Sequence, residues 1–359
     1  MARVQHPPAP SAALRRDLIA FALFAAIGCG LIAAANHASR SYYPEGEIMA
    51  RMFERSFARV AQAQVLVVGG SLSGGIRFEG LDAPGEHLHF PAGDIFEAEA
   101  ALDLALPRAE DVRAVIVTVG ASTLFLENGG RAGQAHRRRT AFHALTRVDP
   151  AAMVGGDVRG AVATRLTPLM RHDRWMSHRL YLANRLRGRP TSDDEAYYAR
   201  AAPEDGRRRY DERTVADWAP GAVARNAAAT AAFVAERAEM QTYCAPDVAA
   251  RVEASLHRMT RAAAAHGAVL VIAAPPITPD GFAAEQATFP YQEARLQAAL
   301  DRLRRAGAIV YDDRGLAELS GDPALFRDSY HLNGPGGERY GRLLGERLRA
   351  DAILPPPDA

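Results

Sequence analysis

A serine in a glycine-rich turn is the first residue of this sequence whose type and setting could do chemistry. Ser71 follows the aliphatic run 65–68 in the order Val-Leu-Val-Val-Gly-Gly-Ser, and two more glycines follow at 74 and 75. A short aliphatic run bounded by glycines predicts a buried parallel strand. Ligands of open α/β sheets bind beyond the carboxyl ends of such strands, which makes Ser71 a candidate nucleophile. A phosphate-binding turn or an ordinary connection has the same pattern, although no lysine follows the glycines as a P-loop requires.

The partners that a nucleophilic serine needs stand near the other end of the chain. Asp328 precedes His331 by three residues in the stretch Asp-Ser-Tyr-His-Leu-Asn-Gly, ahead of a helix expected over 338–350. On a tight turn of that spacing, the carboxylate can hold one imidazole nitrogen while the other faces a serine. In this interpretation His331 deprotonates Ser71, Asp328 orients His331, and Ser71 attacks an ester carbonyl to form an acyl-enzyme. Hydrolysis and acyl transfer share that intermediate, so both reactions stay open.

The two motifs together resemble those of the SGNH/GDSL hydrolase superfamily. The strand-Gly-x-Ser turn at Ser71 and the Asp-x-x-His-Leu-Asn run from Asp328 carry the resemblance, which covers about residues 65–126 and 267–350. It is strongest for a membrane-anchored branch that includes accessory proteins of cell-wall and exopolysaccharide O-acylation. The resemblance implies a three-layer α/β fold and a serine esterase or O-acyltransferase acting on an acyl ester of a cell-envelope glycan. It also implies a multi-span membrane O-acyltransferase as a partner.

The resemblance further implies which residues stabilise the oxyanion of such a reaction. Gly93 stands where the family carries a glycine whose N–H is a donor, and Ser122 takes the place of the family's asparagine donor. A loop glycine ahead of an N-cap at Asp94 explains Gly93 equally well. Two departures, Ser122 and a Gly70 where the family has Asp or Asn, keep a second function class open. That alternative is a non-catalytic scaffold of the same fold that binds a polysaccharide or a membrane acyltransferase.

The elements that must position these residues follow from hydrophobic periodicity. Strands and helices alternate before residue 127 and again after residue 245, which predicts a central parallel sheet of about five strands with helices on both faces. The expected strands are 65–68, 85–90, 112–119, 268–274 and 308–311. The expected division is a tail over 1–16, a transmembrane anchor over 17–36, a stalk helix over 37–62, a first half-domain over 63–126, an Arg-rich helical insertion over 127–245, a second half-domain over 246–352 and a tail over 353–359.

An uncharged segment near the N-terminus predicts where the protein acts. Residues 18–35 carry no charge, and Arg15 and Arg16 precede them. About 20 apolar residues span a bilayer, and basic residues before the span favour a cytoplasmic N-terminus. We therefore expect a single-pass protein of the cytoplasmic membrane whose main domain is periplasmic or extracellular. A cleaved signal peptide ending near residue 35 is the alternative, and it exports the same domain.

Charge is unevenly distributed along an otherwise ordinary globular composition. The chain is 48% hydrophobic and 24% charged with a net charge of +1. Residues 131–189 nevertheless hold 13 arginines and three aspartates. On an exported protein, Arg137, Arg138 and Arg139 are candidates for contact with an anionic lipid surface or an acidic glycan, whereas nucleic acid is not expected there. A solvated insertion whose arginines pair with acids elsewhere is the alternative.

Cysteine and histidine positions give little support to a metal or a disulfide. Cys29 and Cys244 are isolated, so neither a disulfide nor a structural zinc site is expected. His87 and His89 alternate on one short strand, a spacing that suits either a metal or simply one face of a strand near the site. We predict no metal and no cofactor.

Overall fold

A five-stranded parallel sheet forms the centre of the computed structural model, which describes residues 12–40, 44–90, 93–129, 135–158, 160–162, 214–239, 246–288 and 290–356. The strands are β1 (Val65–Gly69), β2 (Gly85–His89), β3 (Ala114–Thr118), β4 (Val269–Ala274) and β5 (Ile309–Asp312). Their order is β2-β1-β3-β4-β5, and every neighbouring pair is parallel. The predicted α/β class and five-stranded parallel sheet are confirmed. In sheets of this order, ligands bind where the order reverses, which is between β1 and β3.

Both faces of the sheet are covered, which explains why its strands read as continuous aliphatic runs. In β1, Leu66 and Val68 belong to one buried cluster, whereas Val65 and Val67 belong to another on the opposite face. Successive side chains of a strand point to opposite faces, so a strand buried on both faces needs an apolar residue at every position. All five residues of β1 are buried.

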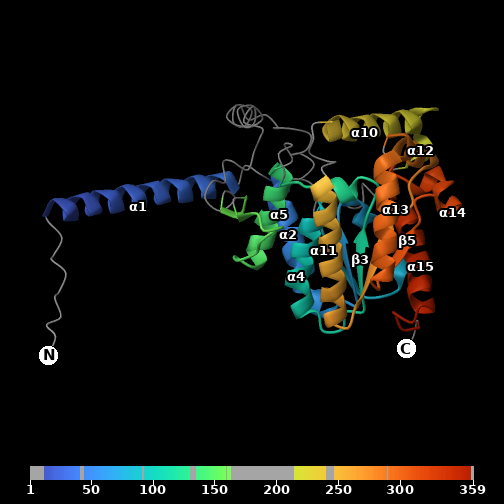
Figure 1. Cartoon of the computed structure of the whole chain (residues 1–359), viewed down its shortest axis with the longest axis horizontal. Helices are drawn as coiled ribbons and strands as arrows, with labels where there is room; N and C mark the ends of the chain where they lie inside the picture. The colour runs from blue at the N-terminus through green and yellow to red at the C-terminus, as the bar shows by residue number, and fades with distance from the viewer. Residues whose placement is uncertain are drawn as a thin grey trace.

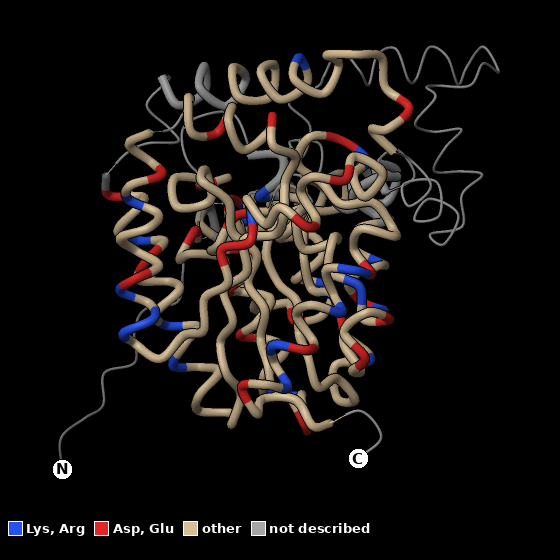
Figure 2. The backbone as a smooth tube through the Cα atoms, turned by 90° about the vertical axis from the view of Figure 1, so that its right-hand side faces the viewer, with Lys and Arg blue, Asp and Glu red and all other residues tan. Residues whose placement is uncertain are grey.

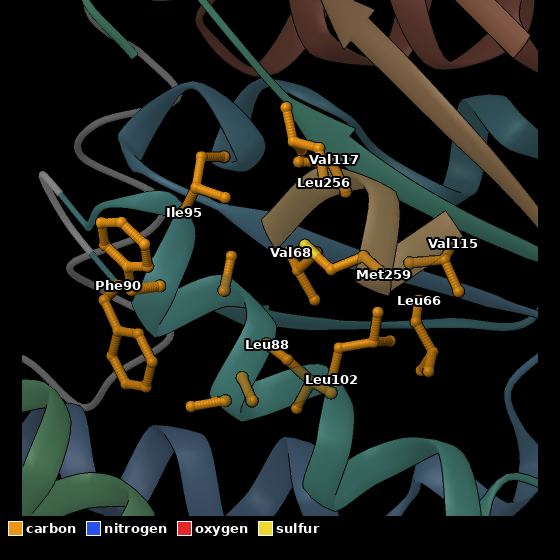
Figure 3. Close-up of a cluster of buried hydrophobic side chains, with 14 of the residues drawn as sticks. Leu66, Val68, Leu88, Phe90, Ile95, Leu102, Val115, Val117, Leu256 and Met259 are labelled. Carbon is orange, nitrogen blue, oxygen red and sulfur yellow. The ribbon is translucent and has the colours of Figure 1, made fainter. Parts of the chain in front are cut away.

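The first face packs against α4 (Ile95–Ala105), α11 (Pro246–Ala265) and α13 (Pro290–Arg305). Figure 3 shows the layer, in which Leu102 of α4 and Met259 of α11 lie against Leu66 and Val115 of the sheet. The helices α2 (Pro44–Ala58) and α5 (Ala135–Val148) pack together at the β2 side of this face. The predicted stalk helix is therefore part of the domain, with Phe53 and Phe57 in its core.

The second face packs against the short helix α3 (Phe78–Leu81) and the last helix α15 (Gly334–Ala350). These two helices approach closely because glycines stand at their contact. A Cβ atom added to Gly80 would lie 1.9 Å from the carbonyl oxygen of Glu338, and one on Gly341 would lie 2.3 Å from that of Arg77. Burial of Leu344 and Leu348 against the sheet fixes α15, and with it the loop that precedes α15.

Two helices lie beyond the carboxyl ends of the strands. Helix α12 (Pro279–Thr288) follows β4, and α10 (Ala222–Glu239) lies across it at the top of the molecule in Figure 1. Helices α5 and α10 both belong to the predicted insertion, whose residues 163–213 lie outside the described ranges. Apart from the first helix, the remaining described elements are α14 (Ala317–Ser320) and the 3₁₀ turns η1 (Val60–Gln62), η2 (Ser71–Gly75), η3 (Leu106–Arg108), η4 (Thr123–Phe125), η6 (Val215–Asp217) and η7 (Pro323–Leu325).

The first helix, α1 (Ala12–Arg40), extends away from the α/β domain (Figure 1). Within the residues that the structure describes, no helix is both long and apolar enough to cross a bilayer. The transmembrane helix predicted over 17–36 is therefore without support from the structure.

Candidate active site

Ser71 stands at the carboxyl end of β1, at the start of the turn η2. The turn needs its glycines. Gly69 has φ +130°, and a Cβ there would lie 2.8 Å from Thr118 Oγ1. A Cβ on Gly70 would lie 3.0 Å from the carbonyl oxygen of Gly93, so this loop approaches the turn at the position where the resembling family has a larger residue. Buried Ser73 secures the turn, because its hydroxyl donates to the carbonyl of Val68 at 3.1 Å.

Asp328 and His331 lie on the loop between η7 and α15. The carboxylate of Asp328 accepts the backbone N–H groups of Tyr330 and His331, each at 2.9 Å, so it closes the turn on itself. His331 Nδ1 lies 2.8 Å from Asp328 Oδ1 and 2.9 Å from Oδ2. Asn333 then caps α15 by accepting the Gly336 N–H at 3.0 Å. The three-residue spacing thus produces a carboxylate–imidazole pair held by local backbone.

The turn of Ser71 and the loop of His331 meet, although 260 residues of sequence separate them. Ser71 Oγ lies 2.8 Å from His331 Nε2, while Nδ1 of the same ring faces Asp328. About a quarter of the His331 side chain is exposed, so the group is sheltered but accessible. Burial by itself raises the pKa of Asp328, but the hydrogen bond and charge of His331 outweigh it and hold that pKa below its ordinary value. The pair is therefore arranged to stabilise an imidazolium at position 331.

The two residues assigned to the oxyanion differ in how the structure uses them. Gly93 lies against Gly70, but its N–H donates to the carbonyl of Phe90 at 2.7 Å. Ser122 is the N-cap of η4 on the loop after β3, and its hydroxyl forms no capping bond. Ser71 opens η2, and the first N–H groups of a helix have no acceptor within it, which makes the Ser71 N–H a further candidate.

The prediction that Arg138 belongs to a lipid- or glycan-binding surface is wrong. Its side chain is 3% exposed, and it donates to Asp94 Oδ2 at 2.5 Å and to Glu97 Oε1 at 3.0 Å. The physical reason is that α4 carries two buried acidic side chains at its first turn, and the guanidinium of Arg138 on α5 pairs with both of them. The side chains of Arg137 and Arg139 lie outside the described residues. Figure 2 shows basic and acidic positions interspersed along the described backbone.

The carboxylates that bind Arg138 also hold the loop that carries Gly93. Asp94 and Glu97 form a capping box, in which each side chain accepts the other's backbone N–H at 2.9 and 3.1 Å. Asn128 joins them by donating its backbone N–H to Asp94 at 2.7 Å. Complete burial and the charge of Asp94 raise the pKa of Glu97 to about 8, against the opposing charge of Arg138. These residues therefore form a buried network of ion pairs and hydrogen bonds next to the Gly93 loop, which in turn lies against the turn of Ser71.

Sequence reasoning missed that the insertion supports the loop of Asp328 and His331. The hydroxyl of buried Ser329 donates to the carbonyl of Val223 on α10 at 3.0 Å, and Tyr330 donates to that of Ala227 at 3.4 Å. Val215 N–H reaches the carbonyl of Phe326 at 2.8 Å. The sequence gives no signal for these three contacts, because each acceptor is a backbone carbonyl, which every residue has; Asn226 of α10 also accepts the Ser329 N–H through its side chain at 3.4 Å.

Glu285 on α12 is a second missed residue, and it lies between the two halves of the site. A Cβ atom built on Gly120, at the end of β3, would lie 3.8 Å from Glu285 Oε1 and 3.5 Å from the side chain of Leu72. Burial, and then the charge of Glu285, raise the pKa of Tyr330. An acidic residue in an alanine-rich helix gives no signal in the sequence, and α12 itself was not predicted.

Metal-binding clusters are absent from the part of the chain that the structure describes, where no three His, Cys, Asp or Glu side chains are grouped to hold an ion. His87 and His89 share one face of β2 with their rings 5.3 Å apart, and His87 also packs on Phe78 at 4.6 Å. A Cβ on Gly74 would lie 3.8 Å from His89 Nε2, so this face does border the nucleophile turn. Of the two cysteines, Cys29 is exposed on α1, and Cys244 lies outside the described residues.

An open pocket of about 550 Å³ lies away from this site, beside Arg113 at the amino end of β3 and the C-terminal residues 349, 350 and 352–356. The candidate site therefore rests on the convergence of side chains at the carboxyl ends of the strands.

Comparison with known proteins finds no family model that matches the chain and no curated sequence that is significantly similar to it.

Proposed function

We propose that this protein is a serine-dependent acyl hydrolase or acyltransferase of SGNH-like fold. The observation that carries the proposal is the chain of contacts from Ser71 Oγ to His331 Nε2 at 2.8 Å and from His331 Nδ1 to Asp328 at 2.8 Å. A serine hydroxyl becomes a useful nucleophile only when a base can take its proton, and an imidazole oriented by a carboxylate is suited to this. Asp328 also accepts two backbone N–H groups of its own turn, and these bonds hold its carboxylate in line with His331 and Ser71.

In the proposed reaction, Ser71 Oγ attacks the carbonyl carbon of an ester, and its proton passes to His331 Nε2. Asp328 stabilises the imidazolium through Nδ1–H. When the intermediate collapses, the ester C–O bond breaks, and His331 returns the proton to the departing alcohol. Water or an acceptor hydroxyl then attacks the acyl group on Ser71 by the same steps in reverse. The developing oxyanion would be stabilised by the N–H of Ser71, together with Ser122 or a re-aimed Gly93 N–H.

The finer parts of the proposal come from the resemblance at the two motifs. They are export to the cell envelope, an acyl ester of an envelope glycan as substrate, and a multi-span membrane O-acyltransferase as partner. The strand order and the positions of Ser71 after β1 and of His331 after β5 agree with the doubly wound arrangement expected for the fold.

A non-catalytic scaffold is the second candidate, and one observation favours it. The Gly93 N–H, which the resemblance assigns to the oxyanion, donates to Phe90, and Ser122 replaces an amide donor. A site that keeps a serine–histidine pair without a strong oxyanion hole could bind an acyl ester or a glycan without turning it over.

Labelling with a fluorophosphonate probe separates these candidates. We expect the full-length wild type to be labelled, Ser71→Ala and His331→Ala to lose labelling, and Asp328→Asn to retain a slow reaction. Loss of the aspartate in such triads costs about 10⁴-fold in turnover. Ser73→Ala is the matched control, since Ser73 lies in the same turn but its hydroxyl is bonded to Val68 and Thr118.

Labelling that persists in Ser71→Ala would remove Ser71 as the nucleophile. A folded wild type that is not labelled would leave the scaffold. In a deletion strain, full restoration of glycan acylation by Ser71→Ala would support the scaffold as well.

A further inference from the structure

Glu285 is a nearly buried carboxyl group that the proposed mechanism does not use. Its two oxygens have different surroundings. Oε2 lies 3.4 Å from Arg314 Nη1, whereas Oε1 faces Gly120 beside Leu72, the residue after the nucleophile. Only 12% of the side chain is exposed. Oε2 is therefore bonded to Arg314, whereas Oε1 faces the loop at the carboxyl end of β3.

Neutralising Arg314 does not require Glu285. The guanidinium of Arg314 is 2% exposed and makes two bonds to Glu293 at 2.7 Å and two to Asp312 at 2.8 and 2.7 Å. Its bond to Glu285 is the longest of the set. Two carboxylates already satisfy this cation, so the third leaves an excess of negative charge on the side that faces the site.

The pKa values of the two glutamates beside Arg314 are shifted in opposite directions. The hydrogen bond from Arg314 lowers the pKa of Glu293 despite partial burial. Burial raises the pKa of Glu285 to about 7, against the charge of Arg314 and with help from the charges of Glu293 and Asp312. A carboxyl group whose pKa lies near neutral pH, and which stands close to a candidate nucleophile, is typical of functional positions.

The position of Glu285 between the two catalytic loops shows which part of a substrate it could meet. Gly120 and Leu72 lie on the serine side of Glu285, and Glu285 is near enough to Tyr330, the neighbour of His331, for its charge to raise the pKa of that phenol. We propose that Glu285 positions the acceptor in this site: its Oε1 accepts a hydrogen bond from one hydroxyl of a neutral, polyhydroxylated acceptor while a second hydroxyl takes the acyl group from Ser71. This inference rests on the proposed function and selects transfer to a neutral sugar over transfer to an acidic one.

The proposed step is balanced without a proton from Glu285. The attacking hydroxyl oxygen bonds to the acyl carbon, and its proton passes to His331. The ester bond to Ser71 breaks, and Ser71 Oγ takes that proton back. Glu285 only holds the neighbouring hydroxyl, so it is a positioning residue. An acceptor carboxylate would be repelled, because Glu285, Glu293 and Asp312 carry more charge than Arg314 can offset.

The test measures how the acyl-enzyme divides between acceptors. Full-length protein is supplied with 4-nitrophenyl acetate and either methyl glucoside or methyl glucuronoside, and the ratio of acetylated sugar to acetate is followed from pH 5.5 to 8.5. The ratio is used because Ser71 and His331 serve both branches, so a change in the overall rate affects both alike. We expect transfer to methyl glucoside to exceed transfer to methyl glucuronoside, and to rise through about pH 7 as Glu285 loses its proton and accepts a stronger bond.

Three variants isolate the role of Glu285. Glu285→Ala should lower the transfer ratio by about tenfold or more, as expected for loss of a bond to a charged group. Glu285→Gln should give an intermediate ratio that no longer changes near pH 7. Glu293→Gln is the matched control, since Glu293 binds Arg314 and Gln297 but does not face Gly120; it should move the pH at which the ratio rises to a lower value, because it removes a charge that raises the pKa of Glu285, and it should keep the wild-type ratio above about pH 8. Circular dichroism checks that each variant is folded.

The possible failures are distinguishable. A wild type that is labelled by fluorophosphonate but shows an unchanged ratio in Glu285→Ala, or an equal loss in Glu293→Gln, would overturn the role of Glu285 and leave the proposed function standing. A labelled wild type that transfers nothing to either sugar would do the same. An unlabelled wild type would remove both proposals.

Discussion

Substitution of Glu97 by glutamine should change how the free energy of unfolding depends on pH, because this carboxyl group is buried in the network with Asp94 and Arg138. Its pKa is raised from 4.5 to about 8 in the folded protein. Between these values the unfolded chain has lost the proton and the folded chain still holds it. Rising pH therefore favours the unfolded state, by about 1.4 kcal/mol per pH unit and roughly 4 to 5 kcal/mol across the window.

Glu97→Gln removes this titration at a cost in hydrogen bonding. Oε1 of Glu97 accepts from Arg138 and Asn128, and Oε2 accepts from the Asp94 N–H at 3.1 Å. At pH 5 folded Glu97 is a carboxylic acid whose hydroxyl oxygen can still accept a hydrogen bond, whereas the NH₂ group of glutamine cannot, so the variant should lose about 1 to 3 kcal/mol there. Because the wild type loses stability as pH rises and the variant does not lose this contribution, the two curves should cross between about pH 5.5 and 7.

Urea unfolding followed by far-ultraviolet circular dichroism from pH 5 to 9 measures the difference. Glu110→Gln is the control, since Glu110 is exposed and its removal should leave a curve parallel to that of the wild type. Parallel curves for Glu97→Gln and the wild type across pH 5 to 8 would refute the reasoning, because they would mean that Glu97 ionises alike in both states.

Two further predictions concern the backbone that holds the site. Gly69→Ala should lower the free energy of unfolding by about 1 to 3 kcal/mol, because φ is +130° and the new Cβ would meet Thr118, and it should slow fluorophosphonate labelling; wild-type unfolding and labelling would contradict the strain. Ser329→Ala should cost about 1 kcal/mol and reduce the labelling rate, because the loop of His331 loses one of its hydrogen bonds to α10. If Ser329→Ala changes stability alone, α10 supports the fold and not the catalytic geometry.

Part of this structure could be predicted from local sequence patterns. Aliphatic runs such as the one before Ser71 predicted the strands, since a strand covered on both faces must be apolar throughout. The three-residue spacing of Asp328 and His331 predicted their pairing, because the turn that joins them is local. Both patterns involve only residues that are close together in the sequence, so they can be recognised without knowledge of the fold.

Tertiary structure alone decided the rest, because burial and charge pairing depend on which elements pack together. Arg138 belongs to a run of arginines typical of a surface, yet α5 packs beside α4 and buries it between two carboxylates. Glu285 looks like any acid on a helix, and only the placement of α12 above the strand ends brings it beside Gly120. The meeting of Ser71 with His331 has the same origin: parallel strands align their carboxyl ends, and residues 260 positions apart become neighbours at 2.8 Å.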